Sequence, residues 1–427
     1  MLIKHWRVLK YNEFKKILRF EAAGGVFMML FAALALIIAN TPLVEYYNIL
    51  LVQKVTMGIG AFTFSMNLKA FTSDVLMVLF FLNVSMELKK DFEQEILDQK
   101  KQILLPALAA VGGMAVPAFI YYYINRNIPE NINGWAIPCG TDTAFAVAVL
   151  LLIGKGLPRS AKVFLLAAAI FDDLGAIVLI ALFYSNELQY VYLAWVLLGC
   201  TALFALNYFN VVSKVPYIAI SLFLFFMLHE AGIHTTIAGV LLGLAIPLAD
   251  KKDLNHFPLK ELLNDIRPVV SFFILPLFAF VNAGVPVMNL NLSDLYSELT
   301  LGVALGLFVG KQVGIFGVAF ILIQLRLVKM PKNMNFKFIY GTSILAGIGF
   351  TMSIFIGQLS FPNNHAKQEM VVLGILLSSL CASVWGYVYL KYAILSTRKK
   401  AELEELMRAA DELRLEEYNS IHDMDEH

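Results

Sequence analysis

Two adjacent carboxylates, Asp172 and Asp173, lie inside an apolar run that extends from about residue 163 to residue 184. The surrounding side chains are Val, Phe, Leu, Ala, Ile and Gly. A charged side chain at the centre of a bilayer costs about 3 to 15 kcal/mol, depending on the reference state. Carboxylates are hard oxygen ligands, so the chemistry that this pair could do is the binding of a small cation or of protons. An acidic pair satisfied within the core of a soluble protein is the structural alternative.

The composition decides between a membrane setting and a soluble one. Hydrophobic residues make up 59% of the 427 residues and charged residues only 15%, whereas about 45–50% and about 25% are usual in soluble domains. The mean hydropathy is +0.71. So few charges could not solvate the exterior of a globular protein, and stretches of about 20 apolar residues match the thickness of a bilayer. We therefore predict an all-α polytopic membrane protein, because the alternating pattern of an outer-membrane barrel is absent.

Apolar windows predict about twelve transmembrane helices. About twenty mostly polar and basic residues precede the first window, without the short apolar region and cleavage site of a signal peptide, so we expect that window to stay as a span. The windows lie at roughly 22–40, 70–88, 103–124, 135–153, 163–184, 190–208, 215–230, 233–249, 269–286, 300–324, 338–360 and 370–390.

Lysine and arginine residues are distributed unequally between the two sides that these spans define. The side of the N terminus holds 28 of the 33 cationic residues, the other side holds 4, and Lys311 lies within a span. Loops rich in Lys and Arg stay on the cytoplasmic side of a membrane. The charge distribution therefore predicts that both termini are cytoplasmic, and it supports the number of spans.

Two segments are predicted to lie outside the bilayer. Residues 41–69 form a long extracytoplasmic connection, in which residues 49–66 are rich in Val, Leu, Phe and Thr around glycines and predict a β-hairpin. Such a hairpin has little to pack on, so we expect it to contact a partner subunit. We divide the chain into a transmembrane domain, residues 1–396, and a charged cytoplasmic tail, residues 397–427, with a short amphipathic helix followed by disorder.

The fourth and eleventh spans contain residues that interrupt a helix. In the fourth, Pro138 removes a backbone donor just before Thr141 and Asp142, so we expect the chain to unwind there. The eleventh contains Gly347 and Gly349 beside hydroxyl residues, for which close helix packing is the alternative reason. The two spans take matching places in two triplets, spans 3–5 and 10–12, of which the second is inverted. Paired broken helices in inverted repeats indicate the ion site of a transporter.

Lys311, in the tenth span, is the natural counter-ion for one of the two aspartates. Neighbouring helical residues project about 100° apart, so Asp172 and Asp173 cannot face one small partner equally. We expect one of them to bind the cation and the other to contact Lys311, and helical spacing leaves open which does which. Asp142 suits the N-terminal ends of the broken helices, because a negative charge offsets their dipoles. Na⁺ and protons would compete for the same carboxylates, which is antiport in its simplest form.

Further polar positions have several interpretations. Asp74 and Glu87 lie near opposite ends of the second span. Asp74 could be a helix cap, and Glu87 could be an ordinary interfacial charge or a pH-sensitive entrance. His234 begins a helix on the extracytoplasmic side, where a structural role and a pH response both stay open. We group these three with Gly349 as candidates for an access route or for the pH response.

Several motifs together resemble the bacterial NhaA-type Na⁺/H⁺ antiporter family, and the similarity extends over residues 15–395. Antiporters of this type are among the transporters in which inverted repeats place paired broken helices at the ion site. The motifs are Ile170-Phe171-Asp172-Asp173-Leu174-Gly175-Ala176-Ile177, Gly134-Trp135-Ala136-Ile137-Pro138 with Thr141-Asp142, Pro276-Leu277-Phe278-Ala279-Phe280 with Asn282-Ala283-Gly284-Val285, Gly310-Lys311, and Gly347-Ile348-Gly349-Phe350-Thr351-Met352-Ser353-Ile354-Phe355.

The resemblance implies an electrogenic antiporter of the bacterial inner membrane, not an enzyme, which expels Na⁺ or Li⁺ in exchange for more than one proton. Its role would be pH and sodium homeostasis by alternating access. Asp173 would be the principal cation ligand and Asp172 the proton-linked partner of Lys311. Thr141 and Asp142 would lie at the helix crossing and also belong to the ion site.

The same resemblance implies access routes and partners. Asp74 and Glu87 would line the routes to the site, and extracytoplasmic hairpins would join a homodimer, in agreement with residues 49–66. The expected partners are the transported Na⁺, Li⁺ and H⁺, the lipid bilayer and a second copy of the chain. No cofactor, no resident metal other than the transported ion and no nucleic acid is expected.

The sequence departs from the family pattern at the cytoplasmic start of the ninth span. Family members commonly place Glu and then His there, where they affect the pH response. Here the aligned residues are Leu263 and Arg267, with Glu261 and Asp265 nearby. The pH profile of the family therefore does not transfer directly to this chain. Cys139 also stands where a small Ala is frequent.

Two other function classes fit the aspartates less well. An intramembrane aspartyl protease needs two aspartates that face each other from separate helices, usually in a Gly-x-Gly-Asp context. Asp172 and Asp173 are neighbours on one helix, and that motif does not occur. A carrier for an organic anion is also disfavoured, since two acidic residues would repel its substrate.

Overall fold

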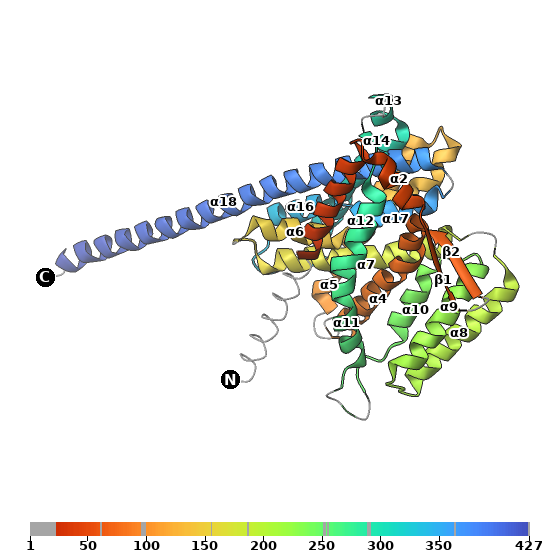
Figure 1. Ribbon diagram of the computed structural model, residues 1–427. Coiled ribbons are helices and arrows are strands. Elements are labelled where there is room, and N and C mark those ends of the chain that lie inside the picture. The colour runs from red at the N-terminus through yellow and green to blue at the C-terminus, as the bar shows by residue number, and fades with distance from the viewer. Residues whose placement is uncertain are drawn as a thin grey trace.

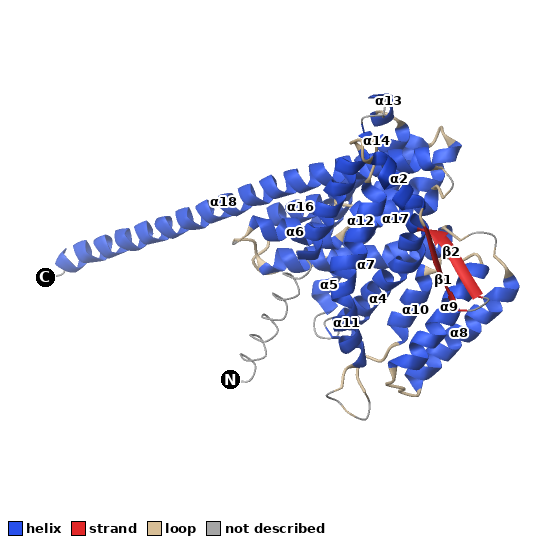
Figure 2. Ribbon diagram, in the orientation of Figure 1, coloured by secondary structure: helices blue, strands red, loops and turns tan. Residues whose placement is uncertain are grey.

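The computed structural model describes residues 23–59, 62–94, 100–154, 156–185, 188–250, 253, 256–287, 292–362 and 364–425. Within these residues helices predominate, and the single sheet is a two-stranded hairpin (Figure 2). Most helices pack side by side in one body, from which the C-terminal helix projects (Figure 1).

The α-helices and strands follow one another along the chain without a second sheet in the described part. They are the helix Ala23–Ala39, α2 (Val44–Val52), β1 (Lys54–Ile59), β2 (Phe62–Asn67), α3 (Leu68–Phe71), α4 (Met77–Gln94), α5 (Lys100–Asn125), α6 (Thr143–Ile153), α7 (Arg159–Phe183), α8 (Tyr190–Tyr208), α9 (Lys214–Glu230), α10 (Thr236–Ala245), α11 (Pro258–Val269), α12 (Leu275–Ala283), α13 (Leu292–Leu295), α14 (Glu298–Leu305), α15 (Gly317–Gln324), α16 (Phe336–Leu345), α17 (Phe350–Ser360) and α18 (His365–Asp425).

Among the described elements, five segments have a tighter or wider helical turn than an α-helix. The segment η2 (Pro129–Cys139) is a 3-10 helix. Four π-helical segments lie inside longer spans, namely η1 (Thr72–Leu76), η3 (Val270–Ile274), η5 (Gly306–Gly310) and η6 (Gln312–Phe316). Segments of π-helix are frequent at functional sites.

In the described part of the chain, seven helices are long and apolar enough to cross a membrane, or up to ten if each of three bent pairs is one span. These ten correspond to ten of the predicted windows. The other two windows hold α9, of 17 residues, and α10, of 10 residues. The usual length of a full crossing is about 20 residues, so α9 is at the short end of the range and α10 is below it. The number of twelve spans therefore stays a prediction, while the chain is a multi-pass membrane protein.

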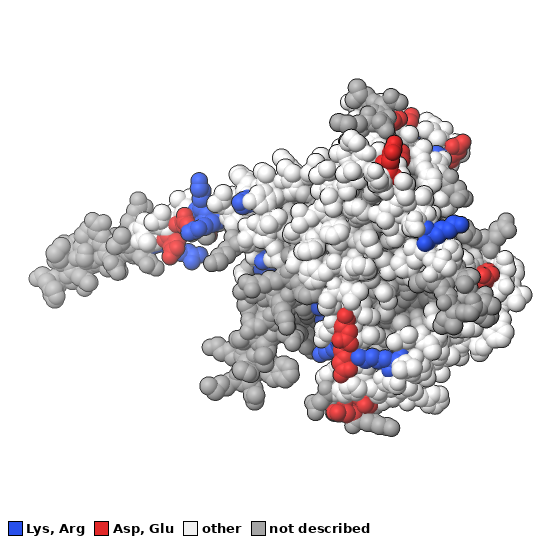
Figure 3. Space-filling model, viewed as in Figure 1, with Lys and Arg blue, Asp and Glu red and all other residues white. Residues whose placement is uncertain are grey.

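The outer surface has the character of a lipid-facing one. Large apolar side chains are exposed on it, among them Leu182, Leu197, Leu222 and Leu380. Figure 3 shows a broad uncharged middle on one face of the body, with Lys, Arg, Asp and Glu at its margins. Apolar side chains in the middle and charges at the edges are the arrangement that a bilayer favours.

A β-hairpin forms where we predicted one at residues 49–66, but it starts five residues later, at Lys54, and ends one residue later, at Asn67. The strands β1 and β2 pair antiparallel, from Lys54 opposite Asn67 to Ile59 opposite Phe62, and their turn lies outside the described residues. Residues 49–52 belong to α2 instead. That helix buries Tyr47, whose hydroxyl donates to the Phe280 carbonyl at 2.6 Å, and this contact favours a helix over an extended strand.

The C-terminal tail does not form a separate short helix. The helix α18 continues from the last predicted span to Asp425, so the end that we expected to be disordered is helical. Arg398 and Glu402 lie 3.0 Å apart, and Lys400 and Glu404 lie 3.8 Å apart, each pair one turn apart on the helix. Such pairs stabilise an exposed helix by about 0.2–0.5 kcal/mol each.

Candidate ion site

Two broken helices meet at the centre of the molecule. The first breaks between η2 and α6 with a bend of 47°, and the second breaks between α16 and α17 with a bend of 48°. Both interruptions lie where we predicted them. The amide of Asp142 donates to the carbonyl of Ile348 at 2.7 Å, so the two unwound segments are bonded directly to each other.

Asp142 caps the N-terminal ends of both broken helices. Its Oδ1 accepts a hydrogen bond from the Phe145 amide of α6 at 2.9 Å. Its Oδ2 accepts from the amide and the hydroxyl of Thr351 in α17, at 3.0 and 2.6 Å. One buried carboxylate therefore offsets two facing positive dipole ends, as the spacing of the broken spans predicted.

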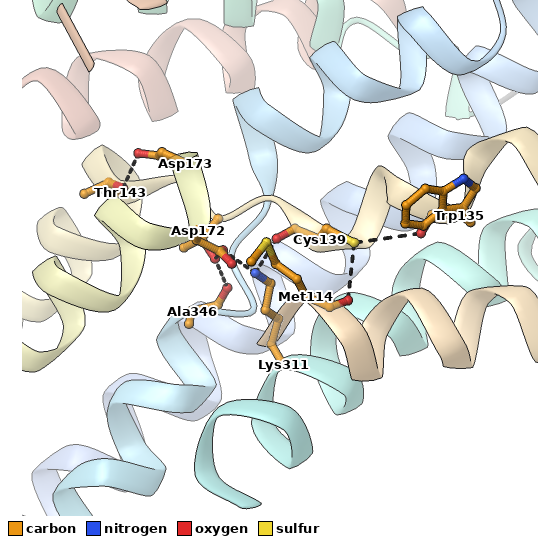
Figure 4. Close-up of polar contacts among 9 residues, drawn as sticks. Met114, Trp135, Cys139, Thr143, Asp172, Asp173, Lys311 and Ala346 are labelled. Atoms are coloured by element: carbon orange, nitrogen blue, oxygen red, sulfur yellow. Dashed lines mark hydrogen bonds and ion pairs between the residues drawn. The ribbon is translucent and has the colours of Figure 1, made fainter. Parts of the chain in front are cut away.

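Lys311 forms a buried ion pair with Asp172. Its Nζ contacts Asp172 Oδ2 and donates to the Cys139 carbonyl at 2.5 Å (Figure 4). The Thr141 hydroxyl oxygen lies 2.5 Å from the same Asp172 Oδ2 and 2.9 Å from the carbonyl of Ala346. Lys311 is 0% exposed and Asp172 is 2% exposed. The structure thus pairs Asp172 with Lys311, a choice that helical spacing had left open.

Asp173 projects away from this ion pair, on another side of α7 (Figure 4). It is 7% exposed, its Oδ1 has no hydrogen-bond partner within the described structure, and its Oδ2 lies 3.4 Å from the hydroxyl oxygen of Thr143. Two carboxylates that diverge in this way do not face each other across a substrate. This geometry disfavours the aspartyl protease alternative.

Close contact between two helices places Lys311 in the interior. Lys311 lies between η5 and η6, and glycines on either side of it pack against α5. A Cβ atom on Gly310 would clash with Pro117, and one on Gly314 would clash with the carbonyl of Gly112. Small residues that let two backbones approach are typical of membrane helix interfaces.

Several groups at the site were assigned no role from the sequence. Thr143 was not singled out, and Thr351 was only one of the hydroxyl residues beside the second break. Thr143 contacts Asp173, and Thr351 contacts the capping residue Asp142. The carbonyls of Cys139 and Ala346 have no signal in the sequence, because every residue carries the same group.

Glu87 lies in the second half of α4 and contacts α11. Its Oε1 accepts from Arg267 Nη2 at 2.6 Å, from Arg267 Nε at 3.0 Å and from the Asn83 amide at 3.1 Å. Arg267 therefore forms an ion pair that joins α4 to α11. Leu263, one turn earlier on α11, is buried.

Asp74 and His234 lie near the opposite end of the same span. The Thr235 hydroxyl donates to the backbone carbonyl of Asp74 at 2.8 Å, and the ring of His234 packs edge-on against Phe355 of α17, with 5.7 Å between the ring centres. Only Gly349, of the four access candidates, lies at the helix crossing, as the residue that precedes α17. A Cβ there would meet the side chains of Ser353 and Leu307.

Comparisons with known proteins point to one family. Residues 15–390 match the family model described as Na⁺/H⁺ antiporter 1. The Na⁺/H⁺ antiporter NhaA of Psychrobacter arcticus is 44% identical over 89% of this chain and 95% of its own. NhaA of Vibrio parahaemolyticus is 44% identical over 88% and 96%, and NhaA 2 of Pseudoalteromonas atlantica is 46% identical over 85% and 90%.

A solved structure shares the fold at low sequence identity. The sodium proton antiporter MjNhaP1 from Methanocaldococcus jannaschii has a TM-score of 0.52 and 14% identity, and the match covers 89% of this chain and 97% of that one. Because the family model spans most of the chain and the relatives match nearly their whole length, this chain belongs to the Na⁺/H⁺ antiporter 1 family.

Proposed function

We propose that the protein is an electrogenic antiporter that expels Na⁺ or Li⁺ in exchange for protons. The observation that carries this proposal is the division between two neighbouring aspartates at the crossing of two broken helices. Asp172 forms an ion pair with Lys311 through Oδ2, whereas Asp173 has no cationic partner within the described structure. Each of the two carboxylates keeps one buried oxygen, Oδ1, without a hydrogen-bond partner there. Family membership, and relatives that are named Na⁺/H⁺ antiporters, support the choice of ions.

Asp173 is the cation ligand in this proposal, and Asp172 is the proton-linked residue. A buried carboxylate without a cationic partner can take either a proton or a small cation, so the two compete for the same oxygens. Asp172 exchanges its contact with Lys311 for a proton. Thr141, which also contacts the Ala346 carbonyl, holds the Asp172 side chain in place, and Asp142 holds the two broken helices together.

The architecture that we propose has twelve spans, with inverted repeats formed by spans 3–5 and 10–12. Its support is that the two broken spans bend by nearly the same angle, 47° and 48°, with both N-terminal ends at Asp142. The protein would lie in the bacterial inner membrane with both termini in the cytoplasm, as the distribution of Lys and Arg predicts. A homodimer would form through the hairpin.

Transport in everted membrane vesicles tests the function. Na⁺ and Li⁺ should dissipate a preformed ΔpH, K⁺ should not, and Asp173→Asn should abolish the response. Asp265→Asn is a matched control, because it makes the same change on a carboxylate that is exposed at the start of the ninth span. Full activity of Asp173→Asn would overturn the assignment of the cation ligand, and a wild-type protein without Na⁺ response would overturn the function.

A further inference from the structure

We propose that Thr143 is a further ligand of the transported cation, which binds between its hydroxyl oxygen and the carboxylate of Asp173. This inference rests on the proposed function and adds a residue to its site. Thr143 is the first residue of α6, and Asp173 lies near the middle of α7, so the two side chains meet at the helix break (Figure 4).

The distance between the two oxygens suits a shared ion. Thr143 Oγ1 lies 3.4 Å from Asp173 Oδ2, whereas an ordinary hydrogen bond between two oxygens measures about 2.7 to 2.8 Å. Ligand oxygens about 2.4 Å from a cation of the size of Ca²⁺ or Na⁺ lie about 3.4 Å apart when they subtend a right angle at the ion. The 3.4 Å spacing of the two oxygens is therefore one at which both could bind the same Na⁺.

Asp173 supplies the second, independent observation. Its other oxygen, Oδ1, is buried without a hydrogen-bond partner among the residues that the structure describes, and the residue is nine-tenths buried. An unpaired buried carboxylate oxygen is costly unless a proton or a cation occupies it. Together the two carboxylate oxygens and the hydroxyl form one side of an oxygen cage for a hard cation.

Thr143 and Thr141, the threonine that the sequence predicted as an ion ligand, differ in the contacts of their hydroxyl groups. The Thr141 hydroxyl already lies between Asp172 and the Ala346 carbonyl, so it positions the ion pair. The Thr143 hydroxyl lies against Asp173 alone among its described contacts. The N-terminal end of α6 would repel a cation at this point, but the Asp142 carboxylate that caps it offsets the positive dipole.

A hydroxyl ligand has a consequence that can be measured. A threonine oxygen can bind a cation through a lone pair, but it does not titrate in the neutral range. Its removal should therefore weaken the binding of Na⁺ and leave the protonation of the site largely as it was. The expected loss of Na⁺ affinity is about 10-fold or more, as for other changes around bound metal ions.

Purified protein in proteoliposomes allows the test, with Na⁺-driven proton flux measured across a range of Na⁺ concentrations and pH. Thr143→Val keeps the shape of the side chain without its oxygen and should raise the KM for Na⁺ by about 10-fold or more at every pH. The maximal rate and the shape of the pH profile should be the same as in the wild type. Thr143→Ser should restore the KM, and Thr201→Val, a hydroxyl bonded to its own helix in α8, should change nothing.

The outcomes separate this inference from the function on which it rests. An unchanged KM in Thr143→Val beside a Na⁺-dependent wild type overturns the inference alone. A lower maximal rate with unchanged KM in the Val and Ser variants also overturns it, because that pattern is one of packing. If Thr143→Val does not fold, Thr143→Ala and the rise in melting temperature on adding Na⁺ provide the same comparison. A wild type without Na⁺ dependence overturns both proposals.

Discussion

At the scale of single residues, the ion pair between Lys311 and Asp172 is the most deeply buried one among the described residues. Both side chains are almost fully buried, and the pair is completed by the Cys139 carbonyl and the Thr141 hydroxyl. Taking two charges out of water is costly, and their mutual attraction with additional hydrogen bonds repays that cost only while both partners are present. The contact therefore depends on protonation, because a proton on the Asp172 carboxylate would remove its attraction to the Lys311 ammonium group.

We predict that Lys311→Ala destabilises the protein, because it leaves the carboxylate of Asp172 buried without its partner. Breaking a buried pair by removing one member costs about 3–5 kcal/mol, which thermal denaturation in detergent should detect as a lower melting temperature. The ratio of protons to Na⁺ in proteoliposomes should change as well.

The double variant Lys311→Ala with Asp172→Asn is the control for this prediction. It removes both charges, so part of the lost stability should return if the unpaired charge is the cause. An unchanged melting temperature together with an unchanged transport ratio in Lys311→Ala would speak against the role of the pair.

At the scale of elements, an ion pair between Glu87 and Arg267 joins α4 to α11. Glu87 of α4 binds Arg267 of α11 through two guanidinium nitrogens. A guanidinium stays charged throughout the range in which proteins are stable, so this contact does not depend on the protonation of its cationic member. A histidine at the same place would make the contact between the two helices sensitive to pH.

We predict that Arg267→His makes the stability of the protein depend on pH near neutrality. An imidazole is charged below about pH 6.5 and neutral above it, so the ion pair with Glu87 would be present in acid and lost as the pH rises. The difference should be about 1 kcal/mol or less, as for other partly exposed pairs, and should appear as a lower melting temperature at pH 8.5 than at pH 6 relative to wild type.

Arg267→Lys is the matched comparison, because it keeps a permanent charge at nearly the same place. Its melting temperature should follow that of the wild type across pH. Equal behaviour of the His and Lys variants would show that the charge of residue 267 does not couple the two helices. The pH profile of transport, measured in parallel, reports whether this contact also controls access.

At the scale of the whole molecule, the hairpin of β1 and β2 is a small sheet attached to the side of a helical body (Figure 1). A two-stranded hairpin is marginally stable on its own in water, and its edge strands present unpaired backbone groups. These properties agree with the proposal that a second copy of the chain covers it. The two ends of the hairpin lie together, because the amide of Leu68 donates to the carbonyl of Gln53 at 3.0 Å.

We predict that excision of residues 54–67, with Gln53 joined to Leu68 through a two-glycine link, shifts the protein from dimer to monomer. The adjacent ends should let α2 and α3 keep their places, so Na⁺-driven proton flux per chain should persist. Light scattering of the purified protein in detergent, with cross-linking in membranes, measures the oligomeric state.

Truncation after Arg398 is the control for this prediction. It removes much of the projecting part of α18 and should leave the dimer intact. A dimer that survives excision of the hairpin would contradict the prediction.

The sequence by itself determined the class of the protein and the parts of its site. The cost of burying charge in an apolar run is a local property, so Asp172, Asp173 and Lys311 could be singled out from composition and position alone. Pro138 and the glycines of the eleventh span predicted the two helix breaks for equally local reasons, the missing backbone donor of proline and the conformational freedom of glycine. The resemblance of the motifs then pointed to the family that the comparisons confirmed.

Only the tertiary structure decided how these parts face one another. Asp172 is separated from Lys311 by 139 residues, and Asp142 is separated from Thr351 by 209, so the direction of each side chain depends on how whole helices pack. Backbone carbonyls such as that of Cys139 join the site without any trace in the sequence. For the same reason the 3.4 Å spacing of Thr143 and Asp173 and the Glu87–Arg267 pair became visible only once α4, α6, α7 and α11 were in place.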